Sequence, residues 1–145
     1  MTIDHDRYDD DYLRDILATT QTIAMVGASP KPDRPSNGVL AYLNRAGYAT
    51  YPVHPGLAGG TIHGRTVVAR LADVPVPIDM VDVFRNSDAI PALVDEVLAL
   101  DPLPKVVWLQ LAIRNDSAAA RLEAAGVRVV MDRCPAIERP RLLSR

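Results

Sequence analysis

The side chains best suited to bind a ligand are concentrated in one loop, GASPKPDRPSN, at positions 27–37. Two of them, Lys31 and Arg34, are cations that can bind phosphate groups. The loop also offers small or hydrogen-bonding residues beside these cations, namely Gly27, Ala28, Ser29, Pro30, Ser36 and Asn37. A helix N-terminus is predicted directly after the loop, and its free N–H groups would face the same space. These features predict a diphosphate-sized anion site, although each cation taken alone fits a solvated loop charge equally well.

A strand and a helix must hold this loop in place, and the sequence predicts both. Residues 23–26 (IAMV) form a short apolar run, which is typical of a buried strand in a parallel sheet. From Ser36 onward, apolar residues recur at helical spacing, and Gly47 is placed to end that helix. Three prolines and the absence of apolar periodicity make the segment between strand and helix a loop.

The rest of the chain repeats this alternation of strand and helix. Further strands are predicted at 48–53, 79–84, 105–109 and 127–131. Helices are predicted over about 9–19, after a cap at Ser87 or Asp88, and over about 116–125 after a cap at Asn115 or Asp116. The alternation predicts an α/β fold of the Rossmann-like, doubly wound type, with a mainly parallel five-stranded sheet and helices on both faces.

Three segments have a less regular pattern. Residues 1–11 are expected to form a loose tail or the fraying start of the first helix. Residues 66–71 fit a strand or a helix equally well. From Asp132 onward the chain, with Pro135 and Pro140, is expected to be irregular or to form a final short turn. A chain of 145 residues is most simply one domain, 1–145.

The predicted topology brings several loops to one edge of the sheet. In a parallel sheet, ligands bind beyond the carboxyl ends of the strands. The loops that follow the predicted strands are 27–37, 54–60, 85–88, 110–115 and 132–134. One ligand could contact several of them. Arg85 is a further candidate because it directly follows an apolar strand, although a salt bridge to Asp88 or Asp132 would also account for it.

The composition narrows the choice of partner. Sixteen basic and 18 acidic residues give a net charge of −2, so neither nucleic acid nor an anionic membrane is an expected partner. No apolar run approaches the roughly 20 residues of a membrane span, and the acidic N-terminus is unlike a signal peptide. We therefore expect a cytoplasmic protein with a small-molecule ligand. The strand-end loops would also suit a protein partner.

The sequence does not fit the common nucleotide-binding motifs. The dinucleotide fingerprint G-x-G-x-x-G requires a compact turn, but the next glycine after Gly27 is Gly38. An acidic residue that would bind the ribose should end the second strand, and His54 follows that strand instead. No GK[ST] of a Walker loop occurs.

No catalytic site and no metal site are predicted. We expect His5 to be exposed in the acidic tail, His63 to be structural, and His54 to have a binding or turn role rather than that of a general base. Arg133 could make Cys134 reactive by lowering its pKa, but an inert, half-buried cysteine is favoured.

The third strand carries two carboxylates. Asp79 and Asp82 could form a pair, but the favoured interpretation is that Asp79 begins the strand and Asp82 makes a structural hydrogen bond. Trp108 lies within a predicted strand and is expected in the core. The acidic run at 9–11 suits a helix N-terminus better than a metal site.

Taken together, five segments of the chain resemble the CoA-binding protein family. They are IAMVGASPKPDRPSNGV, GYATYPVHPG, PIDMVDVFRN, VVWLQLAIRND and GVRVVMDRCPAIERPRL, which span residues 22 to about 142. This family is the stand-alone relative of the CoA-binding domain in the alpha subunit of succinyl-CoA synthetase and in ADP-forming acyl-CoA synthetases. The resemblance implies a Rossmann-like fold with coenzyme A as its cofactor.

The resemblance also implies where coenzyme A would lie. The diphosphate would lie at residues 27–31 and the helix start, the adenosine end near residues 54–57, and the pantetheine arm past residues 84–85 and 109–111. The expected cofactor-binding residues are Gly27, Ala28, Ser29, Pro30, Lys31, Arg34, Ser36, Asn37, His54, Pro55, Phe84, Arg85 and Gln110. The chain departs from the family pattern at Leu57, where the synthetase domain has lysine, and at Ala112, where glycine is common.

Two kinds of function fit the sequence. The favoured one is a binding protein that holds coenzyme A or an acyl-CoA without catalysis, as a carrier, a sensor or a partner subunit. The alternative is an enzyme that acts on an acyl-CoA or a nucleotide through Cys134 or His54, with an NAD(P)-dependent oxidoreductase as its least favoured version. The chain has no counterpart of the synthetases' phosphohistidine domain, so ligase activity is not expected.

Overall fold

A single parallel sheet organises the protein, as the computed structural model of the chain shows for residues 2–143, the part that it describes. The sheet has five strands in the order β2-β1-β5-β6-β7, all of them parallel to their neighbours. The strands are β1 (Thr22–Val26), β2 (Ala49–Val53), β5 (Met80–Val83), β6 (Val106–Leu109) and β7 (Arg128–Val130). A small antiparallel hairpin, β3 (Thr61–Ile62) and β4 (Arg65–Thr66), follows β2. The predicted Rossmann-like fold is confirmed.

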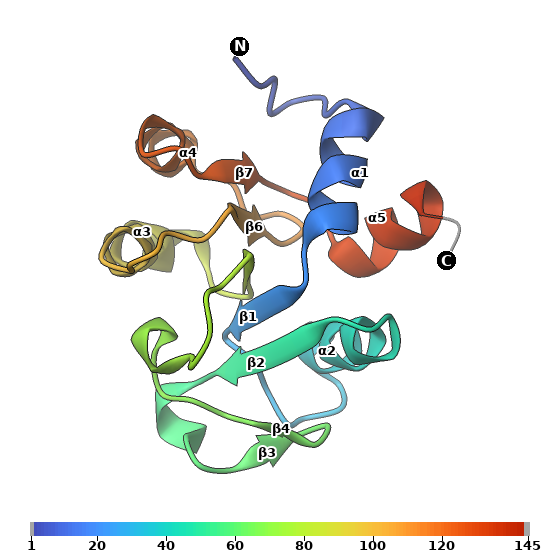
Figure 1. The fold of residues 1–145 in the computed structure, drawn as a ribbon, viewed down its shortest axis with the longest axis vertical. Coiled ribbons are helices and arrows are strands. Elements are labelled where there is room, and N and C mark those ends of the chain that lie inside the picture. The colour runs from blue at the N-terminus through green and yellow to red at the C-terminus, as the bar shows by residue number, and fades with distance from the viewer. Residues whose placement is uncertain (1, 144–145) are drawn as a thin grey trace.

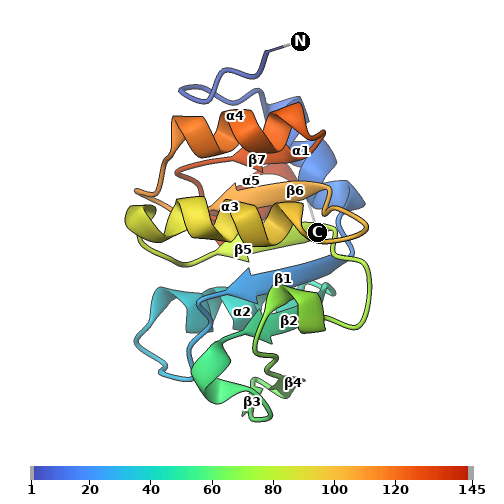
Figure 2. The same ribbon diagram turned by 90° about the vertical axis from the view of Figure 1, so that its left-hand side faces the viewer.

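Five helices cover the sheet on its two faces (Figures 1 and 2). They are α1 (Asp10–Thr19), α2 (Pro35–Arg45), α3 (Ile90–Leu98), α4 (Asp116–Ala124) and α5 (Pro135–Leu142). Helices α3 and α4 pack on one face, and α1, α2 and α5 on the other. The sheet is therefore buried on both sides, which explains why its strands are apolar runs without alternation. No helix within residues 2–143 is long and apolar enough to cross a membrane.

The register of the sheet aligns the carboxyl ends of its central strands. Val26 of β1 pairs with Val53 of β2 and with Val83 of β5, and Val83 pairs with Leu109 of β6. The loops after these strands therefore leave the sheet at one edge, as predicted. Trp108 is wholly buried in the core, and its Nε1–H donates to the carbonyl oxygen of Arg133 at 2.9 Å.

Most of the predicted helix boundaries are confirmed, but one cap is wrong. The side chain of Asn115 caps α4 by accepting a hydrogen bond from the N–H of Ala118 at 2.9 Å. Neither Ser87 nor Asp88 caps α3; residues 87–89 form a 3₁₀ turn that leads into the helix, and Ala89 at the N-cap makes no side-chain capping bond. Pro91 lies in the first turn, where its missing N–H leaves no hydrogen bond unmade.

The C-terminal segment differs from the prediction, because it forms the helix α5 rather than an irregular end. Pro135 occupies the first helical turn, where proline is favoured. The helix buries Glu138 and Leu142, and Arg141 forms ion pairs with Glu138 at 2.7 Å and with Asp10 of α1 at 2.9 Å. Tertiary contacts with α1 thus stabilise a short helix that the sequence did not predict, because its two prolines suggested an irregular segment.

The N-terminal segment also differs from the prediction of a loose tail. The hydroxyl of Tyr8 accepts a hydrogen bond from the backbone N–H of Met131 at 2.8 Å. His5 is half-buried rather than exposed, because its ring lies between Tyr8 and Glu123, at 2.7 and 3.2 Å. Met1 lies outside the described residues.

Residues 66–71, which the pattern left undecided, are neither a full strand nor a helix: Thr66 ends β4, Val68 touches the free edge of β2, and Leu71 begins a 3₁₀ turn. Val68 forms a parallel bridge with Val53, and its N–H donates to the carbonyl oxygen of Pro52 at 3.0 Å. The N–H of His54 donates in turn to the carbonyl oxygen of Val68 at 2.9 Å. This pairing carries the following residues, 69 and 70, to the edge of the sheet where β2 ends.

Candidate functional site

A cavity of about 1010 Å³ opens at the carboxyl ends of β1, β2, β5 and β6. This volume lies at the upper end of the range of about 300–1,000 Å³ that small-molecule sites occupy. Twelve of the 13 residues predicted from the sequence line it, namely Gly27, Ala28, Ser29, Pro30, Lys31, Arg34, Ser36, His54, Pro55, Phe84, Arg85 and Gln110. The topology therefore gathers residues from four separate strand ends around one space.

Gly27 begins the loop at the floor of the cavity, and its position requires glycine for two reasons. Its φ of +82° lies in the left-handed region. A Cβ atom there would clash with the carbonyl oxygen of Phe84 and would lie 3.2 Å from Cδ of Arg85. The absence of a side chain thus allows the loop after β1 to cross close to the end of β5.

Asn37 is the predicted residue that does not line the cavity. Its Nδ2 donates to the carbonyl oxygen of Ser29 at 3.0 Å, and its Oδ1 lies 2.9 Å from Nε2 of His63. The hydroxyl of Ser29 accepts a hydrogen bond from the N–H of Lys31 at 3.2 Å. Asn37 therefore holds the shape of the loop from within, and His63 has the structural role that was predicted for it.

Three cations line the cavity without an acidic partner. Within residues 2–143, no carboxylate forms an ion pair with Lys31, Arg34 or Arg85. The alternative salt bridge from Arg85 to Asp88 or Asp132 is therefore wrong. Most other arginines of this part of the chain pair with carboxylates, so Lys31, Arg34 and Arg85 are cations whose charge no neighbouring carboxylate neutralises.

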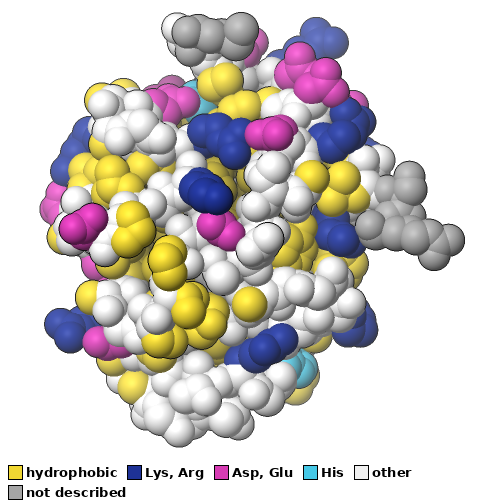
Figure 3. Space-filling view, in the orientation of Figure 1, with side chains coloured by type: hydrophobic (Ala, Val, Ile, Leu, Met, Phe, Trp, Pro, Cys, Tyr) yellow, Lys and Arg dark blue, Asp and Glu magenta, His cyan; other side chains and the backbone are white. Residues whose placement is uncertain are grey.

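The excess of cations around the cavity is not a property of the protein surface in general. On the face shown in Figure 3, basic and acidic side chains are interspersed, as the net charge of −2 suggests. In the cavity, by contrast, Lys31, Arg34, Arg70 and Arg85 face a single carboxylate, that of Glu96. The cavity is thus more positive than the protein as a whole.

His54 has the turn role that the sequence favoured. Its Nδ1 accepts a hydrogen bond from the N–H of Gly56 at 3.0 Å, which caps the 3₁₀ turn Pro55–Leu57. Since Nδ1 is an acceptor, the neutral ring carries its proton on Nε2. The ring also lines the cavity, with Leu57 beside it.

Sequence patterns missed two charged residues of the cavity. Arg70 lines the cavity because Val68, two residues earlier, is paired with the end of β2, a pairing that no local pattern revealed. Its guanidinium lies 3.4 Å from Asp73, in an exposed pair. Glu96 lies in the middle of α3, and its Oε1 accepts a hydrogen bond from the N–H of Leu71 at 3.0 Å. Glu96 is exposed on the helix, and its contact with Leu71, 25 residues earlier, is one that no local pattern reveals.

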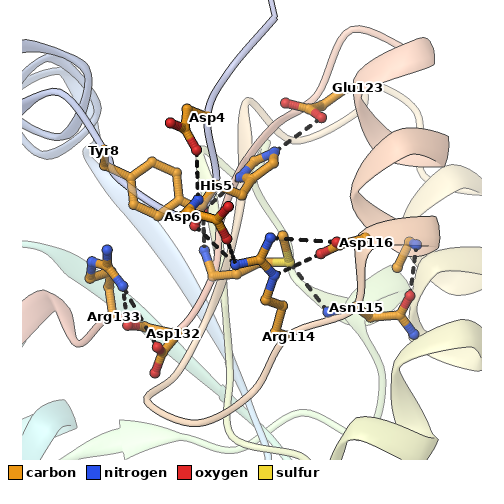
Figure 4. Close-up of polar contacts among 12 residues, drawn as sticks. Asp4, His5, Asp6, Tyr8, Arg114, Asn115, Asp116, Glu123, Asp132 and Arg133 are labelled. Atoms are coloured by element: carbon orange, nitrogen blue, oxygen red, sulfur yellow. Dashed lines mark hydrogen bonds and ion pairs between the residues drawn. The ribbon is translucent and has the colours of Figure 1, made fainter.

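The wall formed by the β6–α4 loop is held by contacts with the N-terminal segment (Figure 4). Arg114 binds Asp6 at 2.6 Å and Asp116 at 2.7 Å, so it joins the N-terminal segment to the start of α4. The hydrogen bond to Asp116, and after it the one to Asp6, raises the pKa of Arg114. The hydrogen bond from Arg114 lowers the pKa of Asp116. Leu111 and Ile113, on either side of Ala112, line the cavity.

Asp82 contradicts the prediction of a structural hydrogen bond. Its side chain is wholly buried in the sheet, and neither carboxyl oxygen has a hydrogen-bond partner within the described residues. Burial raises the pKa of its carboxyl well above the ordinary value of 3.8. Asp79 lies directly before β5, which begins at Met80, and its Oδ2 accepts hydrogen bonds from the N–H groups of Gln21 and Thr22 at 2.8 and 3.1 Å. Asp79 and Asp82 are three residues apart and face opposite sides, so they form no pair.

Cys134 is more deeply buried than a half-exposed thiol. It is 6% exposed, packs in the apolar cluster under α1, α2 and α5, and precedes α5 without a capping bond. It is not among the residues that line the cavity. The structure thus separates Cys134 from the site that the other predicted residues form.

Comparison with known proteins agrees with this architecture. Bacillus subtilis YneT, an uncharacterized protein, is 36% identical over 122 residues, which are 84% of this chain and 87% of that protein. A Thermus thermophilus structure, cell-free ID.343, has a TM-score of 0.87 and 41% identity, and covers 93% of this chain and 99% of its own. A hypothetical protein from Pyrococcus horikoshii OT3 has a TM-score of 0.87 and 36% identity, covering 99% and 98%.

A larger protein contains the same fold as one part. The dinucleotide forming acetyl-coenzyme A synthetase 1 of Ca. Korarchaeum cryptofilum matches 80% of this chain over 27% of its own, with a TM-score of 0.66 and 21% identity. At that identity the match shows the fold alone. The CoA binding domain family itself matches residues 21–140. This range includes all the strands, helices α2, α3 and α4, and most of α5. The chain therefore belongs to the CoA binding domain family.

Proposed function

We propose that the protein binds coenzyme A or an acyl-CoA in the cavity at the carboxyl ends of its strands. The observation that carries this proposal is the group of three unpaired cations, Lys31, Arg34 and Arg85, around a cavity large enough for a nucleotide and an extended arm. Membership of the CoA binding domain family supports the choice of ligand.

The diphosphate is proposed to lie over the loop 27–36. Helix α2 begins at Pro35 with no side-chain cap. Pro35 has no N–H, and the N–H groups of Arg34 and Asn37 donate to the carbonyl oxygens of Lys31 and Arg34, so the N–H of Ser36 is the one that this first turn offers to an anion. Lys31 and Arg34 add charge next to it, and hydrogen bonds between charged groups contribute about 1.5–3 kcal/mol each. Gly27 and Ala28 allow a close approach of the ligand to the backbone.

The two ends of the ligand are proposed to extend along the cavity in opposite directions. The adenosine end would lie near His54 and Pro55, where Leu57 offers an apolar surface and Arg70 adds a cation. Arg70 lines the same cavity as Leu57, which stands where the family resemblance predicts a lysine. The pantetheine arm would pass Phe84 and Gln110 toward Leu111, an exposed apolar residue at the rim.

We propose a holding role rather than catalysis. Nδ1 of His54 is engaged by the N–H of Gly56, and Cys134 is buried outside the cavity lining. Neither of the two side chains that the enzyme hypothesis required is placed as a nucleophile with its base. The protein would thus present a bound coenzyme A to another component, as a carrier, a sensor or a partner subunit.

Calorimetric titration of the purified protein tests this proposal. Coenzyme A should bind with saturation and NAD should not. Arg34→Ala should weaken coenzyme A binding about tenfold or more, because one charge-assisted contact is lost. Arg45→Ala is the matched control, since Arg45 is an exposed arginine at the other end of the same helix and does not line the cavity. Equal effects of the two substitutions, or preference for NAD, would overturn the proposal.

A further inference from the structure

Three buried side-chain atoms lack a hydrogen-bond partner within residues 2–143, and they belong to two residues. They are Oδ1 and Oδ2 of Asp82 and Oε1 of Gln110. Asp82 is 0% and Gln110 8% exposed. Buried polar groups without partners are rare in folded proteins, and each one needs an explanation. Because the two residues lie close together, one explanation could account for both.

The sheet brings the two side chains to the same face. Asp82 of β5 pairs with Trp108 of β6, and Gln110 lies two residues after Trp108, directly beyond the end of β6 at Leu109. The N–H of Gln110 still donates to the carbonyl oxygen of Val83, at 3.4 Å, so the segment after β6 remains hydrogen-bonded to β5 there. Asp82 and Gln110 are therefore diagonal neighbours, about 8 Å apart between Cα atoms, within reach of a long side chain.

Within the part of the chain that the structure describes, no donor hydrogen-bonds to Asp82. It lies between Met25 and Trp108, and the indole N–H of Trp108 already donates to Arg133. An ionised carboxylate and the amide oxygen of Gln110 are both acceptors and cannot bond to each other. A protonated carboxyl group carries an O–H that Gln110 Oε1 can accept. Burial, with no contribution from a charged neighbour, raises the pKa of Asp82 and favours that form.

We infer that Asp82 is protonated and donates a hydrogen bond to Oε1 of Gln110, directly or through one water molecule, so that the Gln110 amide is held with its N–H groups available to a carbonyl oxygen of the ligand. The inference rests on the proposed function, since Gln110 lines the cavity. Asp82 is then a positioning residue, because it acts on the ligand only through Gln110. The structure thereby gives a buried acid a role in recognition of the amide-bearing arm.

In any test that varies the pH, the effect of titrating Asp82 must be distinguished from the effects of the other titratable groups on this face of the sheet. They are Tyr8 before α1 and Tyr12 within it, Tyr42 in α2 and Tyr48 after it, Cys134 directly before α5, and Glu138 and Arg139 within α5. Burial raises the pKa values of Tyr8 and Tyr12 to about 12, and Glu138 is paired with Arg141 at 2.7 Å. Cys134 is the remaining group of concern, so the pH series is carried out in a Cys134→Ala background.

The test compares two substitutions of Asp82 by calorimetric titration with coenzyme A. Asp82→Val removes the donor and should weaken binding about tenfold, the effect of one lost hydrogen bond. Asp82→Asn keeps an N–H donor and should retain most of the affinity. The affinity of the parent protein should fall as the pH rises through the pKa of Asp82, whereas that of Asp82→Asn should not show this component. Val81→Ala, on the opposite face of β5, controls for general weakening of the strand.

The role through Gln110 has its own test. In a Gln110→Leu background, Asp82→Val should have no further effect on affinity, because the side chain that it positions is gone. The inference is wrong if Asp82→Val binds like the parent, if Asp82→Asn loses as much affinity as Asp82→Val, or if the effect persists in Gln110→Leu.

A failure of the proposed function would be distinguishable from a failure of this inference. If the parent protein does not bind coenzyme A, the proposed ligand is wrong. The pair can then be tested without a ligand by urea unfolding of the single and double substitutions of Asp82→Val and Gln110→Leu. Non-additive shifts of the unfolding midpoint support a direct interaction, and additive shifts refute it.

Discussion

The backbone N–H of Ala112 donates to Oδ1 of Asp132 at 2.6 Å, and both residues have left-handed backbone, with φ of +67° and +57°. Asp132 tolerates this conformation better than Ala112, because its side chain makes local hydrogen bonds. The bond joins the loops after β6 and β7 at the rim of the cavity. Strain at a non-glycine residue beside a ligand site is a common feature of functional loops.

Ala112→Gly should therefore stabilise the protein by up to about 1 kcal/mol, because glycine adopts φ of +67° without a steric penalty. Urea unfolding measures the change. Ala120→Gly is the matched control, since Ala120 lies exposed within α4, where glycine should cost about 1 kcal/mol. A loss in Ala112→Gly as large as that in Ala120→Gly would contradict the prediction.

Gly27→Ala should lower the unfolding free energy, and by more than Ala112→Gly raises it. The added Cβ would clash with the carbonyl oxygen of Phe84, at a φ of +82°, so we expect a loss of about 1–3 kcal/mol in unfolding free energy and weaker coenzyme A binding. Gly38→Ala is the control, because a Cβ at Gly38 in α2 meets nothing within 4 Å. It should leave stability unchanged or raise it by up to about 1 kcal/mol. Equal outcomes for the two glycines would show that the close approach at Gly27 is unimportant.

The buried carboxyl of Asp82 should make stability depend on pH. Its folded pKa is raised above the unfolded value near 3.8, so the folded state binds the proton more tightly. The contribution to stability is fully present below that value and is lost as the pH rises through the folded pKa. Asp82→Asn should remove this part of the decline, so the difference in unfolding free energy between parent and variant should change with pH in that window. A difference that stays constant with pH would show that Asp82 does not titrate there.

Local patterns were sufficient for the elements and for much of the cavity. The strands are continuous apolar runs, and most strand-end residues, such as His54 and Arg85, come to one edge in any parallel sheet. The patterns failed where distant segments decide the structure. Arg70 reaches the cavity because Val68 forms a bridge with β2, and α5 forms because it packs on α1. Asn37 lay at the right place in the sequence, but its hydrogen bonds to Ser29 and His63 turn it into a support of the loop.

Asp82 shows a different limit of sequence patterns. An aspartate within an apolar strand predicts a polar contact, because buried polar groups are nearly always hydrogen-bonded. The sequence cannot show that the neighbouring polar side chain, Gln110, presents an unpartnered acceptor on the same face of the sheet. The register of β5 and β6 places Asp82 beside Trp108, two residues before Gln110, and this spatial relationship is what the proposed hydrogen bond depends on.

The N-terminal segment gives the last prediction, which concerns Tyr8. Its hydroxyl accepts the N–H of Met131 at 2.8 Å, and Met131 is wholly buried at the end of β7. Tyr8→Phe removes the acceptor and leaves a buried N–H without its partner, so unfolding free energy should fall by about 1–3 kcal/mol. Tyr51→Phe is the control: Tyr51 is also half-buried, and its hydroxyl makes no hydrogen bond within residues 2–143. Hydrogen exchange should show faster exchange of the Met131 amide in Tyr8→Phe alone, because the bond that protects it is lost. Equal stability of the two variants would show that the N-terminal segment does not hold β7 in place.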